Sequence, residues 1–145
     1  MKMKIKRVFL ASDHAGFVLK QKISKFLTSK EIKILDLGTK NSSSVDYPDF
    51  AHLLAKKMRK EKNNMGILIC GSGEGMIMAA NKHKNIRAAL CYDKKSTELS
   101  RKHNNANVIA IGSRLTKKSL ALRYVEIFLK TNFEGGRHIK RVKKI

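Results

Sequence analysis

Met65-Gly-Ile-Leu-Ile-Cys70, followed directly by Gly71-Ser-Gly-Glu-Gly75, decides the fold of this 145-residue chain. The first six residues form a short apolar run of the kind that predicts a strand buried on both faces. Three glycines in the next five positions predict a loop whose backbone can approach a ligand closely. The small residues from 76 to 82 then predict a helix. A buried strand, a glycine loop and a helix in this order form the repeating unit of an α/β fold.

The same alternation continues on both sides of this stretch. We expect four further strands, at 5–11, 31–37, 86–91 and 107–112. We expect four further helices, at 15–29, from Pro48 to about Lys62, from the N-cap Asp93 to about His103, and from the N-cap Thr116 to Lys130. Five alternations predict a three-layer α/β/α sandwich, Rossmann-like, with a five-stranded parallel sheet. We expect one domain over residues 1–145, ending in a basic tail at 132–145.

The net charge of +21 raises the possibility of nucleic-acid binding. However, the lysines are spread along the chain, on faces of the predicted helices that we expect to meet solvent, as with Lys20, Lys22 and Lys25. The sequence also has no zinc-finger spacing and no alternation of aromatic and basic residues. These features favour a solvated lysine-rich surface over nucleic-acid binding. Its positive potential would attract a small dianionic substrate.

The apolar runs predict a protein of the cytoplasm. No run is long enough to span a membrane, and the basic residues at 1–7 are followed by too short an apolar segment for a signal peptide. The two cysteines do not make a disulfide framework, and each ends an apolar run.

Polar and ionisable groups follow several of the predicted strands. Asp13 and His14 follow the first strand, Tyr47 ends the loop after the second, Cys70 ends the third, and Arg114 follows the fifth. The carboxyl ends of parallel strands meet at one edge of the sheet, which is where such folds bind ligands. The sequence therefore predicts an active site at this edge.

The glycine loop has two possible uses. Its N–H groups, at the start of a helix, can hold a phosphate or a developing oxyanion. A dinucleotide site is the alternative, because Gly71 and Gly73 fit the first two glycines of G-x-G-x-x-G and Asp93 lies where a ribose-binding acid would be. The third glycine of that pattern would fall at Met76, which weakens this alternative.

Cys70 and Cys91 both end apolar strands, but only Cys70 precedes a glycine-rich helix start that could stabilise a thiolate. Position alone leaves Cys70 open between a reactive thiol and a buried structural residue. We interpret Cys91 as structural.

The histidines and the tail arginines need separate interpretation. We expect His52 and His83 to lie on the surface without a role, whereas His14 can meet an anionic ligand. His103 falls at a helix end, where a favourable contact with the helix dipole would explain it. No histidine or cysteine pair has the spacing of metal ligands, so no metal is expected. Arg137 and Arg141, four residues apart, could clamp a phosphate from one face of a helix or simply form a solvated terminus.

Taken together, these motifs resemble the ribose-5-phosphate isomerase B family, which also contains the galactose-6-phosphate isomerase subunits. In chain order, the resemblance rests on Ser12–Phe17, Asp46–Pro48, Ile69–Gly73, Ala79–Lys82, Ile86–Ala88, Ser100–Asn104, Asn107–Val108, Gly112–Arg114 and Phe133–His138. It implies interconversion of ribose 5-phosphate and ribulose 5-phosphate through an enediolate, without a cofactor. The same chemistry on a hexose 6-phosphate of the allose or galactose type, or a non-catalytic module that binds a sugar phosphate or nucleotide, stays open.

The resemblance also implies residue roles. Cys70 matches the proton acceptor, and His103 matches the residue that opens the furanose ring. The expected anion hole and substrate-binding positions are Gly71, Ser72, Gly73, Glu74, Gly75, Asp13, His14, Tyr47, Asn104, Arg114, Arg137 and Arg141. Similar proteins are dimers, or tetramers made of dimers, in which a neighbouring chain completes each site. We therefore expect the tail at 132–145 to contact a neighbouring subunit.

Glu74 departs from the family pattern, because a carboxylate there would oppose both a thiolate and an enediolate. We expect its side chain to point to solvent.

Overall fold

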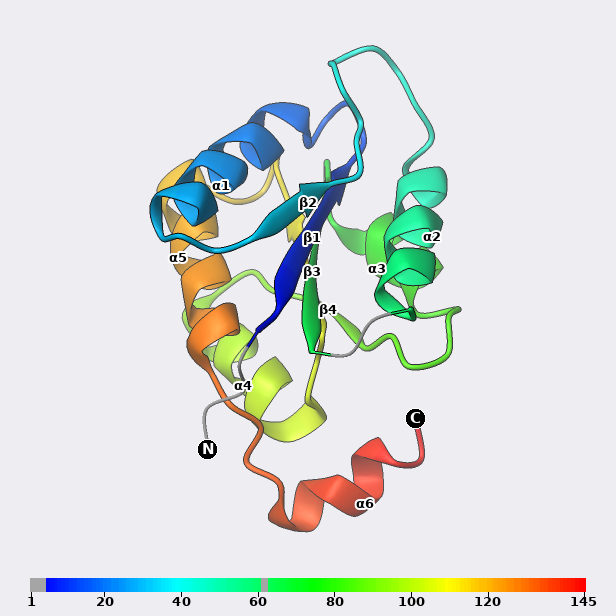
Figure 1. Ribbon diagram of the computed structural model, residues 1–145, viewed down its shortest axis with the longest axis vertical. Helices are drawn as coiled ribbons and strands as arrows, with labels where there is room; N and C mark the ends of the chain where they lie inside the picture. The colour runs from blue at the N-terminus through cyan, green and yellow to red at the C-terminus, as the bar shows by residue number, and fades with distance from the viewer. Residues whose placement is uncertain (1–4, 61–62) are drawn as a thin grey trace.

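A single parallel sheet organises the computed structural model, which describes residues 5–60 and 63–145. Its strand order is β2-β1-β3-β5-β4, which the sequence had left open (Figure 1). The strands are β1 (Arg7–Ser12), β2 (Ile34–Asp36), β3 (Asn64–Cys70), β4 (Ala88–Leu90) and β5 (Val108–Gly112). β3 lies at the centre of the sheet and pairs with β1 on one side and β5 on the other.

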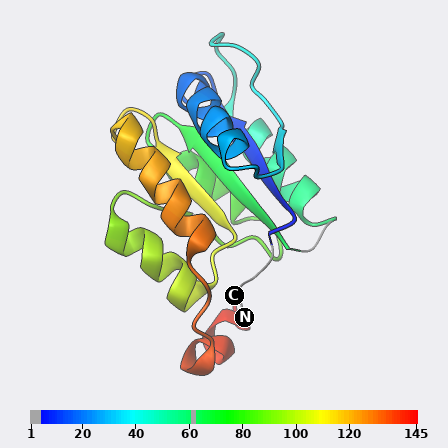
Figure 2. The ribbon, with the colours of Figure 1, turned by 60° about the vertical axis from the view of Figure 1, so that its left-hand side comes forward.

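Helices cover both faces of the sheet, so the predicted three-layer sandwich is confirmed (Figure 2). α1 (Phe17–Ser29), α4 (Lys94–Asn104) and α5 (Lys118–Lys130) pack on one face. α2 (Tyr47–Met58) and α3 (Glu74–Ala80) pack on the other. The tail adds a 3₁₀ turn, Gly136–His138, and the short α6 (Ile139–Val142). None of the described helices is long and apolar enough to cross a membrane.

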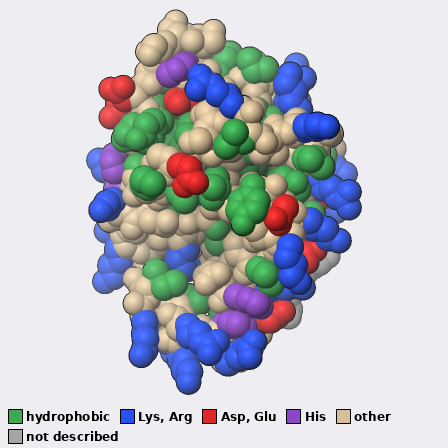
Figure 3. Space-filling view, turned by 180° about the vertical axis from the view of Figure 1, so that it is seen from behind, with side chains coloured by type: hydrophobic (Ala, Val, Ile, Leu, Met, Phe, Trp, Pro, Cys, Tyr) green, Lys and Arg blue, Asp and Glu red, His purple; other side chains and the backbone are tan. Residues whose placement is uncertain are grey.

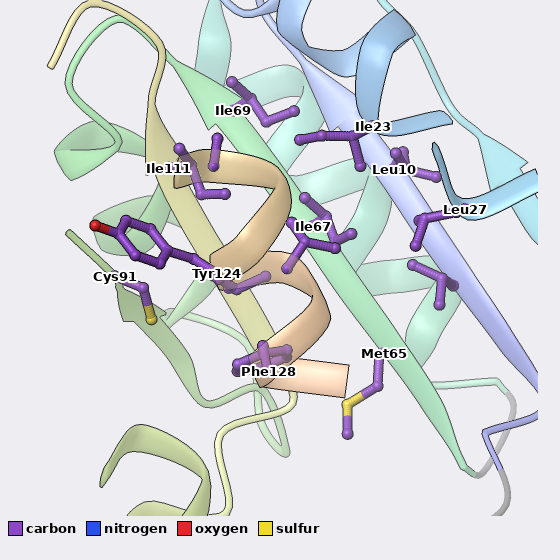
Figure 4. Packing of buried hydrophobic residues seen from close by; sticks show 14 of the residues in the cluster. Leu10, Ile23, Leu27, Met65, Ile67, Ile69, Cys91, Ile111, Tyr124 and Phe128 are labelled. Carbon is purple, nitrogen blue, oxygen red and sulfur yellow. The ribbon is translucent and has the colours of Figure 1, made fainter. Parts of the chain in front are cut away.

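The apolar core has two parts, one on each face of the sheet. Successive side chains of a strand point to opposite faces, so Ile67 and Ile69 pack toward α1 and α5, and Leu68 and Cys70 toward α2 and α3. Figure 4 shows the first part, in which Phe128 of α5 lies over the strands. Every residue of β3 is buried, which explains why its sequence from Met65 to Cys70 is continuously apolar instead of alternating.

Several helix boundaries differ from the sequence prediction. α1 begins at Phe17 instead of residue 15, and α3 spans Glu74–Ala80 instead of 76–82. α2 ends at Met58, before the expected Lys62, and residues 61–62 lie outside the described part of the chain. The Thr116 cap is wrong, because α5 begins after Lys117 and the N–H of Thr116 instead donates to the Gly112 carbonyl in a turn. The other predicted cap is confirmed. Asp93 caps α4 by accepting the Ser96 N–H at 2.6 Å in a reciprocal capping box.

Lys20 corrects the expectation that the lysines of α1 lie in solvent. Its side chain is only 2% exposed, and its Nζ lies 2.5 Å from Asp36 Oδ2 at the end of β2. Asp36 also accepts the Gly38 N–H through Oδ1 at 2.9 Å. This ion pair ties α1 to the edge strand, so one of the basic residues belongs to the fold and not to the surface charge.

We predict that Asp36→Asn lowers the free energy of unfolding by about 2 kcal/mol, because it leaves Lys20 buried without its counter-charge while Asp36 itself is partly hydrated. Glu126→Gln is the matched control. It breaks the exposed Glu126–Lys130 pair within α5 and should cost less than about 0.5 kcal/mol. Urea unfolding followed by circular dichroism measures both, and equal losses would contradict the buried role of Lys20.

Candidate active site

The thiol of Cys70 lies at the mouth of the glycine loop. Its Sγ accepts the Gly73 N–H at 3.1 Å. Gly73 is the N-cap of α3 and has a left-handed φ of 82°, a conformation that favours glycine. The start of α3 therefore places a hydrogen-bond donor at the Cys70 sulfur.

A cavity of about 400 Å³ opens in front of this thiol. Its walls come from the loops after β1, β3 and β5 and from the first turns of α2 and α3. The lining residues are Asp13, Tyr47, Cys70, Gly71, Ser72, Gly75, Arg114 and Leu115. The structure thus brings most of the sequence-predicted residues of this sheet edge into one hollow.

Hydrogen bonds link the loops that form the cavity. Asp13 is buried, and its Oδ1 accepts the Gly16 N–H at 3.0 Å. Ser113 joins two neighbouring loops: its N–H donates to the Cys70 carbonyl and its Oγ to the Ala15 carbonyl, both at 2.8 Å. The position of the thiol relative to the β1 and β5 loops is therefore determined by the backbone.

Tyr47 lies so close to the glycine loop that a side chain at Gly75 would have to displace its ring. A Cβ at Gly75 would lie 2.4 Å from Cε2 of the Tyr47 ring. The tyrosine, at the first residue of α2, can therefore form a wall of the cavity beside the start of α3.

His14 and Glu74 lie near this cavity without lining it. The Nδ1 of His14 accepts the Val45 N–H at 3.2 Å, so the proton of the neutral ring is on Nε2 and can be donated to an anion. Glu74, the first residue of α3, is exposed, as we expected from the cost of placing a carboxylate beside a thiolate.

His103, Asn104, Arg137 and Arg141 lie at the opposite end of the sheet from Cys70. α4 runs back along the sheet and ends at Asn104, just before β5 begins at Val108. β5 alone separates the two ends of the sheet by about 13 Å, at about 3.3 Å per residue. Arg137 and Arg141 lie in the 3₁₀ turn and α6, below the sheet in Figure 1. One chain therefore carries two separate halves of the predicted site.

Three side chains gather at this second end. The Nε2 atoms of His103 and His138 each lie 3.9 Å from Glu134 Oε2. The two imidazole rings stack, with centroids 4.3 Å apart and planes inclined by 12°. We did not predict Glu134 or His138 as site residues, although both belong to the Phe133–His138 motif.

His103, Glu134 and His138 each offer one possible metal-ligand atom, and these three atoms lie within 4.8 Å of one another. The spacing of histidines and cysteines in the sequence did not reveal this group, because one of its members is a glutamate. The ring geometry does not suit a metal ion, however. A ligand nitrogen must point its lone pair at the metal in the plane of its ring, and two nearly parallel stacked rings do not point at one position.

His52 and His83, which we expected to lie on the surface without a role, contact each other. His52 Nδ1 lies 2.7 Å from His83 Nε2, and both rings are partly buried. Burial lowers the pKa of His83, and the neighbouring His52, Lys56 and Arg59 lower it further. A neutral His83 can share one proton with His52, which joins α2 to the turn after α3.

Cys91 differs from Cys70 in its surroundings. Burial raises the pKa of the Cys91 thiol, and its nearest polar side-chain partner is Ser100 Oγ, 3.8 Å from the sulfur. This environment agrees with the interpretation of Cys91 as structural.

We predict that iodoacetamide at pH 8 labels Cys70 well before Cys91. The sulfur of Cys70 lines the cavity, whereas the raised pKa of Cys91 keeps it as the unreactive thiol at this pH. Mass spectrometry of tryptic peptides over time measures the order, and the urea-unfolded protein, in which both should react alike, is the control. Equal labelling of the folded protein would contradict the difference in environment.

Comparisons with known proteins identify the family of this chain. The family model described as Ribose/Galactose Isomerase matches residues 8–145. A probable ribose-5-phosphate isomerase B of Mycoplasma genitalium is 48% identical over 140 residues, covering 95% of this chain and 92% of that protein. The ribose-5-phosphate isomerase B of Escherichia coli K12 is 41% identical over 141 residues, covering 97% of this chain and 95% of that protein.

A solved structure shares the fold as well. The ribose-5-phosphate isomerase B of Mycoplasma genitalium with bound ribulose-5-phosphate superposes with a TM-score of 0.92 at 46% identity, covering 95% of this chain and 92% of that chain. The family match extends over nearly the whole chain, and both relatives exceed two fifths identity. The chain belongs to the ribose/galactose isomerase family.

Proposed function

We propose that this protein is an isomerase that interconverts ribose 5-phosphate and ribulose 5-phosphate, with its whole length forming one catalytic domain. The observation that carries the proposal is the Cys70 sulfur, which accepts the Gly73 N–H at a helix start and faces a cavity that Asp13 and Arg114 also line. The relatives named ribose-5-phosphate isomerase B, one of them with ribulose-5-phosphate bound, support the same reaction.

The geometry suits proton transfer between adjacent carbons. The Cys70 thiolate takes the C2 proton of the open-chain aldose, and the electrons of that bond form the C1–C2 double bond of an enediolate. The N–H groups of the loop from Gly71 to Gly75 stabilise the negative charge on the enediolate oxygen. Return of the proton to C1, together with passage of the O2 hydroxyl proton to O1, gives the ketose with its carbonyl at C2. The thiol and the loop supply the base and the oxyanion donors, so the proposed step uses no cofactor.

We further propose that two copies of the chain share their sites. In a two-fold symmetric dimer with the sheets running in opposite directions, the half-site of His103, Asn104, Arg137 and Arg141 meets the Cys70 cavity of the partner. Residues 132–145 then contact the neighbouring subunit. In support, α6 has no buried residue, so within one chain it lacks the packing that would explain its position.

An exposed apolar region supports the same arrangement. β4 is an edge strand, and Met78 of α3 and Tyr92, which follows β4, are each 65% exposed beside it. Figure 3 shows hydrophobic side chains across the middle of the rear face and Lys and Arg side chains at its lower end. Apolar surface with a basic rim is typical of a surface that another subunit covers.

The charge and the cysteines support two finer parts of the proposal. The positive potential of a chain with net charge +21 attracts a sugar phosphate, and Arg137 and Arg141 are suited to hold its phosphate group. Both cysteines are free, as suits the reducing cytoplasm, where we place the protein.

We predict that Cys70→Ser lowers kcat for ribose 5-phosphate by at least about 100-fold, because a hydroxyl is a far weaker base than a thiolate. Cys91→Ser is the matched control and should keep kcat within about threefold, with some loss of stability from its buried hydroxyl. A coupled spectrophotometric assay measures both. Undiminished turnover by Cys70→Ser would disprove the role of Cys70, and binding without turnover by the native protein would indicate a non-catalytic module.

Ribose 5-phosphate should have a higher kcat/KM than allose 6-phosphate and galactose 6-phosphate. The two curated relatives described above, and the solved structure with ribulose-5-phosphate bound, are named ribose-5-phosphate isomerase B. Steady-state assays of the three aldoses on the native protein test this expectation. A higher kcat/KM for either hexose phosphate would assign the protein to that substrate instead.

Mixing two inactive variants tests the shared site. Cys70→Ser and His103→Asn damage opposite halves, so a hybrid dimer holds one site with both native residues and one site with neither. Unfolding and refolding an equal mixture should restore about a quarter of native activity, because half of the dimers are hybrids with one working site. No recovery, in a mixture whose hybrids are demonstrated by native mass spectrometry, would show that each chain uses its own His103.

A further inference from the structure

The imidazole of His103 has an unusual setting for a residue at a helix end. It is about one-third exposed, its ring stacks on that of His138, and the carboxylate of Glu134 lies 3.9 Å from both Nε2 atoms. A favourable contact with the dipole of α4 would need none of these partners. The helix dipole therefore does not explain why Glu134 and His138 lie against His103.

The cluster is held in place by its backbone. The Glu134 N–H donates to the Lys102 carbonyl at 3.1 Å, next to His103 in the last turn of α4. Arg101, 2% exposed, holds the beginning of the same segment through a 3.1 Å hydrogen bond from Nε to the Thr131 carbonyl. Glu134 therefore reaches His103 from a segment anchored at two points.

The two imidazoles differ in burial. The His138 side chain is 9% exposed, and burial lowers its pKa, as do the nearby His103, Arg137 and Arg141, against the opposing effect of Glu134. The His103 side chain is 36% exposed, so it is the ring of the pair that a substrate can reach.

We propose that Glu134 and His138 are positioning residues for His103 in opening the furanose ring of the substrate. This inference rests on the proposed isomerase function and on the matching role of His103. His138 is the stacked platform that sets the plane of the His103 ring. Glu134 is the counter-charge for the cation that His103 forms during the step.

The chemistry explains why the ring plane matters. His103 accepts the proton of the anomeric hydroxyl at O1, and C1=O1 forms as the bond between C1 and the ring oxygen breaks. The electrons of the broken bond remain on the ring oxygen, which then takes the proton back from His103. Both oxygens are bonded to C1, so one imidazole held in one plane can reach both in turn. No other reactant is consumed.

The experiment separates ring opening from proton transfer between carbons by using a substrate without a ring. 4-Deoxyribose 5-phosphate lacks the hydroxyl that closes the furanose, so it needs the Cys70 step but not the His103 step. A second ring-free readout is deuterium uptake at C1 of ribulose 5-phosphate in D₂O, followed by NMR. Both are compared with kcat and KM for ribose 5-phosphate.

Glu134→Gln should lower kcat for ribose 5-phosphate by about tenfold or more, with little change in KM, while both ring-free readouts stay within about twofold of the native protein. Glu134→Asp, which keeps the charge, should recover part of the loss. Glu126→Gln removes an exposed carboxylate of α5 and is the control for the change in net charge. Thermal unfolding checks that each variant is folded.

His138 variants test the platform separately. His138→Phe keeps a flat ring under His103 and should retain kcat for ribose 5-phosphate within about threefold, whereas His138→Ala should lose about tenfold with its ring-free rates preserved. These variants also keep the proposal testable if Glu134→Gln does not fold.

A parallel fall in ribose 5-phosphate turnover and in both ring-free readouts would overturn the positioning role, as would no fall at all. Failure of the proposed function gives a different result, because the native protein would then turn over neither aldose.

Discussion

The burial of β3 is the constraint on which the rest of the structure depends. The strand pairs on both edges and is covered on both faces, and all of its residues are buried. Cys70 stands at the end of this strand. The left-handed turn at Gly73 then leads the chain into α3, and the Gly73 N–H donates to the Cys70 sulfur. The base that we propose and its hydrogen-bond donor are in this way built from one continuous stretch of backbone.

The parallel direction of all the strands has a second consequence. Every strand ends at the same edge of the sheet and every following helix returns to the other edge, so residues at strand ends and residues at helix ends are kept apart within one chain. Cys70, Asp13 and Arg114 belong to the first group, and His103 and Asn104 to the second. Chemistry that needs both groups requires a second subunit in the opposite orientation, which is the physical basis of the shared site that we propose.

Basic side chains have different roles in different parts of the molecule. Lys20 and Arg101 are buried and hold elements together, the first between α1 and β2 and the second between α4 and the tail. Burial lowers the pKa of Arg101 to about 10, which still leaves it charged at neutral pH. The remaining excess of lysines is compatible with the attraction of an anionic substrate. The basic residues that hold the fold together can be identified only from the groups that they contact in the structure.

From the sequence alone we could determine the fold class, the five strands, the glycine loop and the family, because each follows from the order and spacing of residues within a segment. The glycine loop alone left the role of Cys70 open, and the resemblance to the family is what distinguished it from Cys91. Strand order, the Lys20–Asp36 pair, the His52–His83 contact and the group of Glu134, His138 and His103 required the tertiary structure. These features depend on distances between segments remote in sequence or on the direction of side chains in a folded tail. The order of residue types along the chain does not reveal these distances. Packing across the sheet determines which helix end meets which turn.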